Sequence, residues 1–309
     1  MRTRPSGILV LRLSALGDVI HTIPAVVALR SIDPNIAWVV EGPYRELVEI
    51  VTGVRVIPVS MKRWGRSLVA SRADINVTLR ALRGFERSVD FQGLVKSAAI
   101  PWVARTPERF GFDGQAIREK LALLFTNRRI GVDTTRHVVE WNHALAEGVV
   151  GCSLPMPTVD FSQFPGTGPR FERAIVLLPG AGKANKQWPV ERFRELADRL
   201  GERVITASGP GEEDLARAVG ARMAPPTNLR ELAAVLQSAD LVIGGDTGPL
   251  HLAAALGTRV IGLYGPTSEK RNGPYGQVQR CISSFSGART MEAIEVDDVM
   301  RRVDEVLGS

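Results

Sequence analysis

The chain has 309 residues, of which 44% are hydrophobic and 23% charged. This balance is typical of a soluble globular protein and argues against a disordered chain, and the length exceeds that of most single cores, so we expect two domains. The sequence has no apolar run near the roughly 20 residues that span a bilayer, and Asp18 stands where a signal peptide needs its cleavage region, which together predict a cytoplasmic protein.

The net charge of +6 lies entirely in the first half of the chain. Residues 1–160 carry 21 Lys and Arg against 15 Asp and Glu, whereas residues 161–309 carry 18 of each, and the excess is concentrated between Lys62 and Arg87. A solvated helix face accounts for such a run, but a local basic patch also suits an anionic small molecule or anionic membrane lipids. With 6% aromatic residues and a neutral second half, the chain lacks the stacking platform and basic stripe of a nucleic-acid-binding protein.

Short apolar runs alternate with helical patterns in the first half. Residues 7–13 predict a buried strand, followed by a loop over 14–18 and a helix whose apolar residues recur at helical spacing. Pro24 implies an irregular first turn or a regular helix that begins there. Further strands are expected at 36–40, 55–59 and 89–91, and helices at 44–51 and 94–104.

The second half repeats this alternation after a linker. Residues 151–170 contain four prolines and several glycines without a period. Strands are then expected at 174–178, 203–207, 241–243 and 259–264, and helices at 189–200, 212–221, 229–238 and 296–307. The pattern predicts two consecutive α/β domains at 1–160 and 161–309, each a doubly wound, Rossmann-like parallel sheet; the final helix could pack back on the first domain.

The most informative segment covers residues 241–256, LVIGGDTGPLHLAAAL, which combine a buried strand, a turn and a helix start. Gly244 and Gly245 are expected to turn the chain after the strand. Pro249 suits the first helical turn, where its missing N–H costs nothing.

The turn before this helix has the composition of an anion site. Thr247 and Gly248 would present a hydroxyl and unpaired N–H groups at the helix N-terminus, where the dipole favours negative charge, and His251 adds a donor. A simple cap at Asp246 or Thr247 is the plainer interpretation. The density of polar residues at the carboxyl end of a strand favours a ligand site.

Three other strand ends carry charged residues. Asp18, with His21 one turn later, follows the first strand and either caps a helix or acts as a general base. Lys186 stands just before Trp188 and a helix start, where it would neutralise a phosphate. Glu212 could cap its helix or accept hydrogen bonds from a ribose.

Several common motifs are missing. The sequence has no G-x-G-x-x-G, no G-x-x-x-x-G-K-[ST] and no G-x-S-x-G, which argues against a dinucleotide oxidoreductase, a P-loop NTPase and an α/β-hydrolase. Cys152 and Cys281 are far apart and have no ligand spacing, so both are expected to be packing residues. No carboxylate pair has a spacing suited to Mg²⁺, and neither a metal nor another cofactor is expected.

Three motifs occur in order along the chain: SALGDVIHTIPAV near the N-terminus, NKQWP in the middle, and DTGPLHLAAALG followed by VIGLYGPT. Together they resemble the lipopolysaccharide heptosyltransferases of glycosyltransferase family nine, over nearly the whole chain. MKRWGRS at 61–67 and DFQGLVKSA at 90–98 resemble the inner-core type that adds the first heptose. The resemblance implies a GT-B fold, in which two Rossmann-like domains face a central cleft, with the acceptor on the N-terminal domain and ADP-heptose on the C-terminal domain.

Matching by residue, the resemblance implies that Asp18 is the catalytic base and that Lys186 contacts the donor diphosphate. The implied donor-binding residues are Glu212 on the ribose, then Asp246, Thr247, Gly248, Pro249 and His251, with Gly182 and Lys183 from the loop before the lysine. The implied acceptor-binding residues, for anionic Kdo and lipid A phosphates, are Lys62, Arg63, Arg66, Lys96 and Arg118. Relatives carry hydroxyl residues where this chain has Ala181 and Gly182, so diphosphate contacts there must come from backbone N–H groups or Lys183.

The resemblance thus implies an inverting transfer of heptose from ADP-heptose to a Kdo-lipid A type acceptor in lipopolysaccharide inner-core synthesis. Asp18 would deprotonate the acceptor, while Lys186 and the helix start after Asp246 stabilise the leaving ADP. A peripheral contact with the cytoplasmic face of the inner membrane is a further hypothesis, based on the basic patch and Trp64. A family-nine transferase for another nucleotide sugar or acidic glycan, and a non-catalytic nucleotide- or glycan-binding module, stay open as alternatives.

Overall fold

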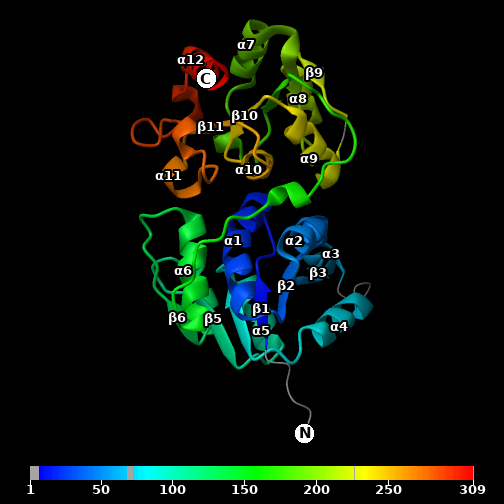
Figure 1. Ribbon diagram of the computed structural model, residues 1–309, viewed down its shortest axis with the longest axis vertical. Coiled ribbons are helices and arrows are strands. Elements are labelled where there is room, and N and C mark those ends of the chain that lie inside the picture. The colour runs from blue at the N-terminus through cyan, green and yellow to red at the C-terminus, as the bar shows by residue number, and fades with distance from the viewer. Residues whose placement is uncertain (1–6, 68–71, 226, 309) are drawn as a thin grey trace. The chain divides into compact units, whose positions relative to one another are not determined.

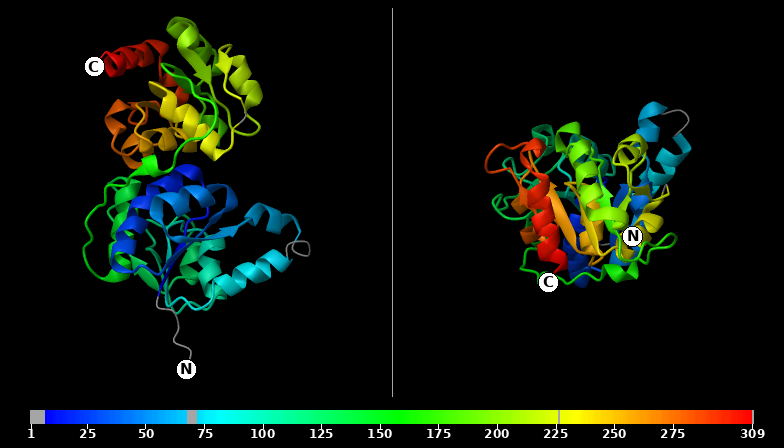
Figure 2. Two further views of the ribbon diagram at one scale, coloured as in Figure 1. Left: turned by 45° about the vertical axis from the view of Figure 1, so that its right-hand side comes forward. Right: turned by 90° about the horizontal axis from the view of Figure 1, so that it is seen from above.

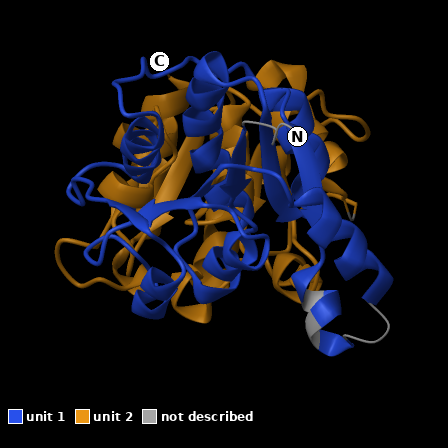
Figure 3. Ribbon diagram, turned by 90° about the horizontal axis from the view of Figure 1, so that it is seen from below, with its two compact units in different colours: residues 1–160 blue, residues 161–309 orange. Residues whose placement is uncertain are grey.

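The structure is a computed structural model that describes residues 7–67, 72–225 and 227–308. The chain divides into two compact units, Met1–Asp160 and Phe161–Ser309 (Figure 3). The boundary lies within the proline-rich segment 151–170. In each unit a parallel sheet lies between layers of helices (Figure 1, Figure 2).

The first unit is built on a six-stranded parallel sheet in the order β3-β2-β1-β4-β5-β6. Its strands are β1 (Ile8–Leu11), β2 (Ile36–Glu41), β3 (Arg55–Val59), β4 (Arg87–Asp90), β5 (Glu108–Phe112) and β6 (Arg128–Ile130). Its helices are α1 (Leu16–Ile32), α2 (Arg45–Thr52), α3 (Met61–Arg66), α4 (Arg72–Ala81), α5 (Val95–Val103) and α6 (Val138–Val150), with a 3₁₀ segment η2 (Lys120–Leu124).

Both faces of this sheet are covered. The helices α1 and α6 pack against each other on one face. On the other face, Leu79 of α4 and Ile100 of α5 pack against a core that includes Leu9, Leu11 and Val39 of the central strands. A parallel sheet covered on both sides needs strands that are apolar at every position, and all four residues of β1 are buried.

The second unit has a six-stranded parallel sheet in the order β12-β11-β10-β7-β8-β9. Its strands are β7 (Ile175–Leu178), β8 (Val204–Thr206), β9 (Arg222–Met223), β10 (Leu241–Gly245), β11 (Val260–Tyr264) and β12 (Ile282–Ser283). Its helices are α7 (Val190–Leu200), α8 (Glu213–Ala218), α9 (Leu229–Ser238), α10 (Gly248–Ala255), α11 (Glu269–Asn272) and α12 (Val296–Leu307), with a 3₁₀ segment η4 (Ala184–Lys186). The final helix α12 packs beside α7 in the core of this unit.

The two sheets share one connectivity. Read from the first strand of each unit, both have the order 3-2-1-4-5-6, the doubly wound arrangement predicted from the sequence. The order reverses between β1 and β4 in the first unit and between β7 and β10 in the second. Ligands of such sheets bind at this switch point, beyond the carboxyl ends of the strands, because the two flanking loops diverge there.

Three local predictions were wrong. The first helix begins at Leu16 and continues through Pro24, so Asp18 lies in its first turn rather than in the preceding loop. Gly244 and Gly245 do not turn the chain but end β10. There a Cβ atom would lie 2.8 Å from Leu178 Cβ at position 244 and 2.9 Å from the Lys186 carbonyl oxygen at position 245, so close approach of neighbouring chain requires these glycines.

The third concerns the cysteines. Cys152 is exposed, because it follows Gly151, which ends α6 with a left-handed backbone at φ +74°. Cys281 is partly buried, and burial raises the pKa of its thiol to about 12. Only Cys281 therefore behaves as a packing residue.

Across residues 7–67, 72–225 and 227–308, the helices are too short or too polar for any of them to cross a membrane.

Candidate functional site

The switch point of the first unit centres on Asp18. Nη2 of Arg118 lies 2.9 and 3.0 Å from the two carboxylate oxygens, and Nη2 of Arg12 lies 3.1 Å from one of them. The side chain of Asp18 is 22% exposed and that of Arg118 is 45% exposed. The carboxylate is therefore held by Arg12 from inside the unit, and part of it stays accessible to solvent. Asp18 is thus a carboxylate held in a fixed orientation at the carboxyl edge of β1.

Arg12 holds this carboxylate from within the protein and was missed by the sequence analysis. It is fully buried directly after β1; Nη1 donates to the carbonyl of Phe91, and Nε donates to the carbonyl of Asp18 at 3.3 Å. Burial lowers the pKa of the Arg12 guanidinium, and the charge of Asp18 opposes that shift. A single arginine inside the apolar run GILVLRL carries no motif, so spacing alone could not identify it.

A second buried carboxyl, that of Asp90, ends β4 on the other side of the switch point. It accepts hydrogen bonds from Gln92 N at 2.9 Å and Ser97 Oγ at 3.0 Å. Burial nevertheless raises the pKa of Asp90 to about 6. Gln92 in turn accepts from the N–H of Leu13 at 2.7 Å, so the loops after β1 and β4 are tied together.

The predicted basic residues follow the carboxyl ends of three strands, β3, β4 and β5. Arg63 and Arg66 of α3 follow β3, Lys96 opens α5 after β4, and Arg118 follows β5, so all four lie beyond carboxyl ends of the same sheet. From β3 to β5 this edge spans about 19 Å, at roughly 4.8 Å per strand. Arg63 is ion-paired with Asp74 of α4, whereas Arg66 and Lys96 are exposed. The side chain of Lys62 lies outside the described residues.

Two residues near this edge, Trp64 and His21, pack inside the first unit. Trp64 is only partly exposed and packs against the core that contains Leu9 and Leu11, so it is not a free membrane-facing side chain. His21 is buried and meets the ring of His137 edge to face, with centroids 5.3 Å apart. It therefore faces the start of α6, whose N-cap residue is His137.

In the second unit, Asp246 joins two of the predicted donor-binding residues. Its Oδ2 accepts from Nζ of Lys186 at 2.6 Å, and its Oδ1 lies 3.1 Å from Nε2 of the buried His251. Burial opposes ionisation of Asp246, but the hydrogen bond and charge of His251 and the ammonium of Lys186 outweigh it and lower the pKa to about 2. Asp246 thus orients the Lys186 ammonium and the His251 imidazole across the switch point between β7 and β10.

The N-terminus of α10 lies beside this cluster and presents hydrogen-bond donors. Pro249 lies in the first turn of α10, as predicted, and Thr247 is the N-cap residue without a side-chain cap hydrogen bond. Within the described part of the chain, the buried Oγ1 of Thr247 has no hydrogen-bond partner. Together with the first N–H groups of α10, beginning at Gly248, this hydroxyl can bind an anion.

The loop after β7, which carries Lys186, is anchored by a buried tryptophan. Lys186 ends η4, and two residues later Trp188 is buried, donating through Nε1 to the carbonyl of Ile294 at 2.9 Å. Gly182 and Lys183, earlier in the loop, are exposed. The tryptophan therefore anchors the loop, and the polar residues before it face solvent.

Glu212 lies against the same loop. It is the N-cap residue of α8, and its Oε2 accepts from Gly209 N at 2.9 Å. A Cβ atom on Gly180 would lie 1.9 Å from this Oε2, so the carboxylate occupies the space that only glycine leaves free. The structure thus brings Glu212 beside the loop that carries Lys186.

These groups form two half-sites. The first is a carboxylate with basic residues along one sheet edge, and the second is a set of cationic and N–H donors with a carboxylate at its side. Within the described ranges, no group of three or more His, Cys, Asp or Glu side chains is arranged to hold a metal ion. The chemistry available is proton abstraction at Asp18 and anion stabilisation around Lys186 and α10.

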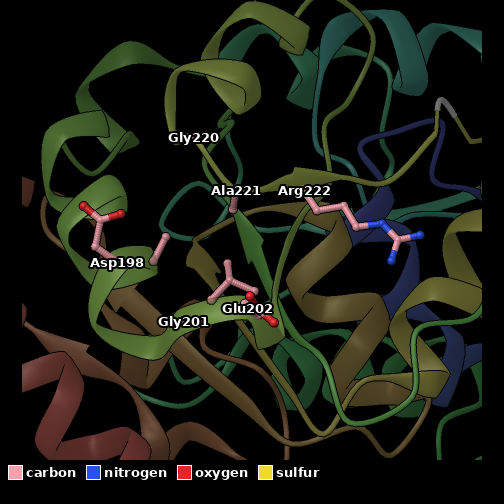
Figure 4. Close-up of a pocket in the computed structure, with 8 residues that line it drawn as sticks. Asp198, Gly201, Glu202, Gly220, Ala221 and Arg222 are labelled. Atoms are coloured by element: carbon pink, nitrogen blue, oxygen red, sulfur yellow. The ribbon is translucent and has the colours of Figure 1, made fainter.

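A pocket of about 420 Å³ lies elsewhere in the second unit (Figure 4). It is lined by residues that include Asp198, Glu202 and Arg222. Val204 and Arg222 are the first residues of β8 and β9, so this pocket lies at the amino edge of the sheet, opposite the switch-point loops. The guanidinium of Arg222 lies over the ring of Phe171, 5.1 Å from its centroid.

Two sheets in Rossmann order, each with charged loops at its switch point, are the architecture of the GT-B glycosyltransferases. The chain belongs to glycosyltransferase family 9, because the model of that family, described as glycosyltransferase family 9 (heptosyltransferase), matches residues 75–298.

Individual relatives support this membership. The chain is 32% identical over 296 residues to lipopolysaccharide heptosyltransferase 1 of Escherichia coli K12, covering 88% of this chain and 92% of that protein. It is 33% identical over 300 residues to lipopolysaccharide heptosyltransferase 1 of Pseudomonas aeruginosa, covering 90% and 83%. The structure of E. coli heptosyltransferase WaaC with ADP superposes with a TM-score of 0.81 at 30% identity, covering 97% of this chain and 99% of the other.

The raised pKa of Asp90 predicts a pH dependence of stability. From pH 4 to 6 the unfolded chain loses this proton while the folded chain keeps it, so stability falls as pH rises, by about 3 kcal/mol for a shift of some two units. Asp90→Asn should remove this loss, because an amide has no proton to release and can still bond Gln92 N and Ser97 Oγ.

Urea unfolding at pH 4.5 and 7.5 checks this prediction. Tryptophan fluorescence reports mainly on the first unit, which holds Trp38, Trp64, Trp102 and Trp141. The variant should gain more stability over wild type at pH 7.5 than at pH 4.5, whereas Asp214→Asn, an exposed carboxyl of the second unit, should change neither. An equal difference at both pH values would show that Asp90 is ionised throughout.

Proposed function

We propose that this chain is an inverting glycosyltransferase that moves heptose from ADP-heptose to a Kdo-lipid A type acceptor in lipopolysaccharide inner-core synthesis. The carrying observation is the pair of half-sites, a supported carboxylate at one switch point and a lysine and a histidine oriented by Asp246 at the other. The relatives named lipopolysaccharide heptosyltransferase 1, and the E. coli WaaC structure with ADP-2-deoxy-2-fluoro heptose at a TM-score of 0.78, support the choice of sugar and nucleotide.

In this proposal the first unit binds the acceptor. Asp18 removes a proton from the acceptor hydroxyl as that oxygen attacks the anomeric carbon, in a single displacement that inverts its configuration. Lys62, Arg63, Arg66, Lys96 and Arg118 bind the acidic groups of the acceptor. Arg118 is the residue that links both tasks, because its exposed guanidinium pairs with Asp18 and is also open to an acceptor carboxylate or phosphate.

The second unit binds the donor. Lys186, His251, Thr247 and the N-terminus of α10 stabilise the negative charge that develops on the leaving diphosphate. Asp246 is ion-paired with Lys186 and lies within hydrogen-bond distance of His251, and it orients both side chains.

The other donor-binding residues lie around this cluster. Glu212 accepts from the ribose hydroxyls. Gly182 and Lys183 approach the diphosphate from the exposed loop, and Pro249 sets the start of α10. No metal or other cofactor takes part in the proposed reaction, which is placed on the cytoplasmic face of the inner membrane.

The central test is release of ADP from ADP-heptose, which should require Kdo-lipid A. Asp18→Asn should lower kcat by about 10²–10⁴-fold while leaving ADP affinity unchanged, because only the base is lost. Lys186→Ala should lower both kcat and ADP affinity. Asp33→Asn, at the far end of α1, is the control for the first substitution.

Two results would count against the proposal. Preference for UDP-sugars over ADP-sugars in a panel of donors would favour a family-nine transferase of other specificity. Tight ADP binding without turnover on any acceptor would favour a non-catalytic nucleotide-binding module.

The close packing of Glu212 on Gly180 gives a second test of the donor site. Gly180→Ala should push the carboxylate away from its position and weaken ADP binding about tenfold or more, because the new Cβ cannot share its space. Gly287→Ala in the same unit is a matched control, since its Cβ would meet only the carbonyl oxygen of Ser284, at 3.9 Å. Calorimetric titration of ADP into both variants measures the difference; equal affinities would remove Glu212 from the donor site.

A further inference from the structure

A group of exposed apolar side chains lies on the first unit. Trp102 and Val103 at the end of α5 are 55% and 51% exposed, and Leu121 and Leu124 of η2 are 68% and 76% exposed. The two elements pack against each other, and the ring of Trp102 meets that of Phe125 edge to face with centroids 5.7 Å apart. These four residues form one surface, called here the α5–η2 patch.

Basic side chains border this patch. Nη2 of Arg129 donates to the carbonyl of Leu123 at 3.2 Å, and Nε of Arg109 donates to the carbonyl of Phe125 at 2.7 Å. Both guanidinium groups are therefore fixed at the end of η2. Arg105 directly follows α5 and Lys120 opens η2, and both are exposed.

The acidic residues of this region are outnumbered, and each of them is held by an ion pair or a hydrogen bond. Residues 95–129 hold seven Lys and Arg against three Asp and Glu. Glu108 pairs with Arg87 and Arg128, Asp113 accepts the N–H of Gln115 at 3.0 Å, and Glu119 accepts the N–H of Val95 at 2.7 Å. The surroundings of the patch therefore carry a net positive charge.

We propose that the α5–η2 patch docks on the surface of a bilayer that contains anionic lipid. Tryptophan and leucine side chains of this exposure insert at the boundary between headgroups and acyl chains, and the flanking arginines and lysines bind lipid phosphates. The choice of a bilayer rests on the proposed function, because an acceptor of the lipid A class is held in one.

The same two elements connect the patch to the acceptor half-site. Lys96 lies in the first turn of α5, whose last residues are Trp102 and Val103, and Arg118 comes two residues before η2. The patch itself lies toward the amino edge of the sheet, because Val103 and Leu124 come shortly before the first residues of β5 and β6, and the acceptor half-site lies at the other end of α5. The surface differs from the one around Trp64, whose side chain packs against the core.

Cosedimentation with vesicles tests the proposal without any donor or activity. Wild type should bind vesicles of phosphatidylglycerol and phosphatidylethanolamine, and less well in high salt or on phosphatidylcholine alone. Leu121→Ser/Leu124→Ser should weaken binding at least tenfold. Ile32→Ser/Val77→Ser, which removes two side chains of 55% and 64% exposure from α1 and α4, is the matched control and should bind as wild type does.

Equal vesicle binding by all three proteins would overturn the proposal. So would a wild-type dimer in light scattering that becomes a monomer only in Leu121→Ser/Leu124→Ser, because a second copy of the chain would then cover the patch.

An activity measurement separates this proposal from the proposed function. Leu121→Ser/Leu124→Ser should release ADP as fast as wild type with a deacylated, water-soluble acceptor, but more slowly with Kdo-lipid A in vesicles. If wild type binds vesicles yet transfers nothing to either acceptor, the proposed function fails while docking stands. If the variant matches wild type on both acceptors, docking fails while the function stands.

Discussion

A buried charge at each switch point is the constraint on which both half-sites depend. Arg12 is buried behind Asp18 in the first unit, and Asp246 is largely buried between Lys186 and His251 in the second. An unpaired charge in such a position costs several kcal/mol, so each must keep its partner in the folded state. The side chains proposed to do the chemistry are therefore held in place by the same contacts that make the buried charges tolerable.

These clusters require unusually close approach of the main chain, and the glycines provide it. Gly180 leaves room for the Glu212 carboxylate, while Gly244 and Gly245 allow β10 to pass against Leu178 and the carbonyl of Lys186. A larger side chain at these positions would separate β7 from β10 at the point where their loops must meet. The parallel order of the strands then brings residues some 60 positions apart, such as Lys186 and Asp246, to 2.6 Å.

The sequence predicted the features that depend on local pattern. Apolar runs marked the central strands of both sheets, and the segments 229–238 and 296–307 were predicted with the bounds that α9 and α12 have. Features that depend on tertiary contacts were missed. Arg12 looks like one polar residue in a strand, Trp64 looks exposed beside basic neighbours, and the short polar strands β6, β9 and β12 have no apolar run of their own. The basic run from Lys62 to Arg87 seemed a single patch, yet only its first members follow the carboxyl end of β3.

The two arginines on Asp18 differ in a way that suits an acidic acceptor. Arg12 is fully buried and bound to the Phe91 carbonyl, so it cannot leave, whereas Arg118 is 45% exposed and free to exchange partners. An arriving carboxylate or phosphate can therefore take the Arg118 guanidinium without leaving Asp18 unpaired. As that pairing shifts, the Asp18 oxygens nearest solvent lose a donor and become available to an acceptor hydroxyl. In the proposed reaction, the acid group of the acceptor would thus also release Asp18 to act as the base, which gives the exposed arginine a role in that proposal.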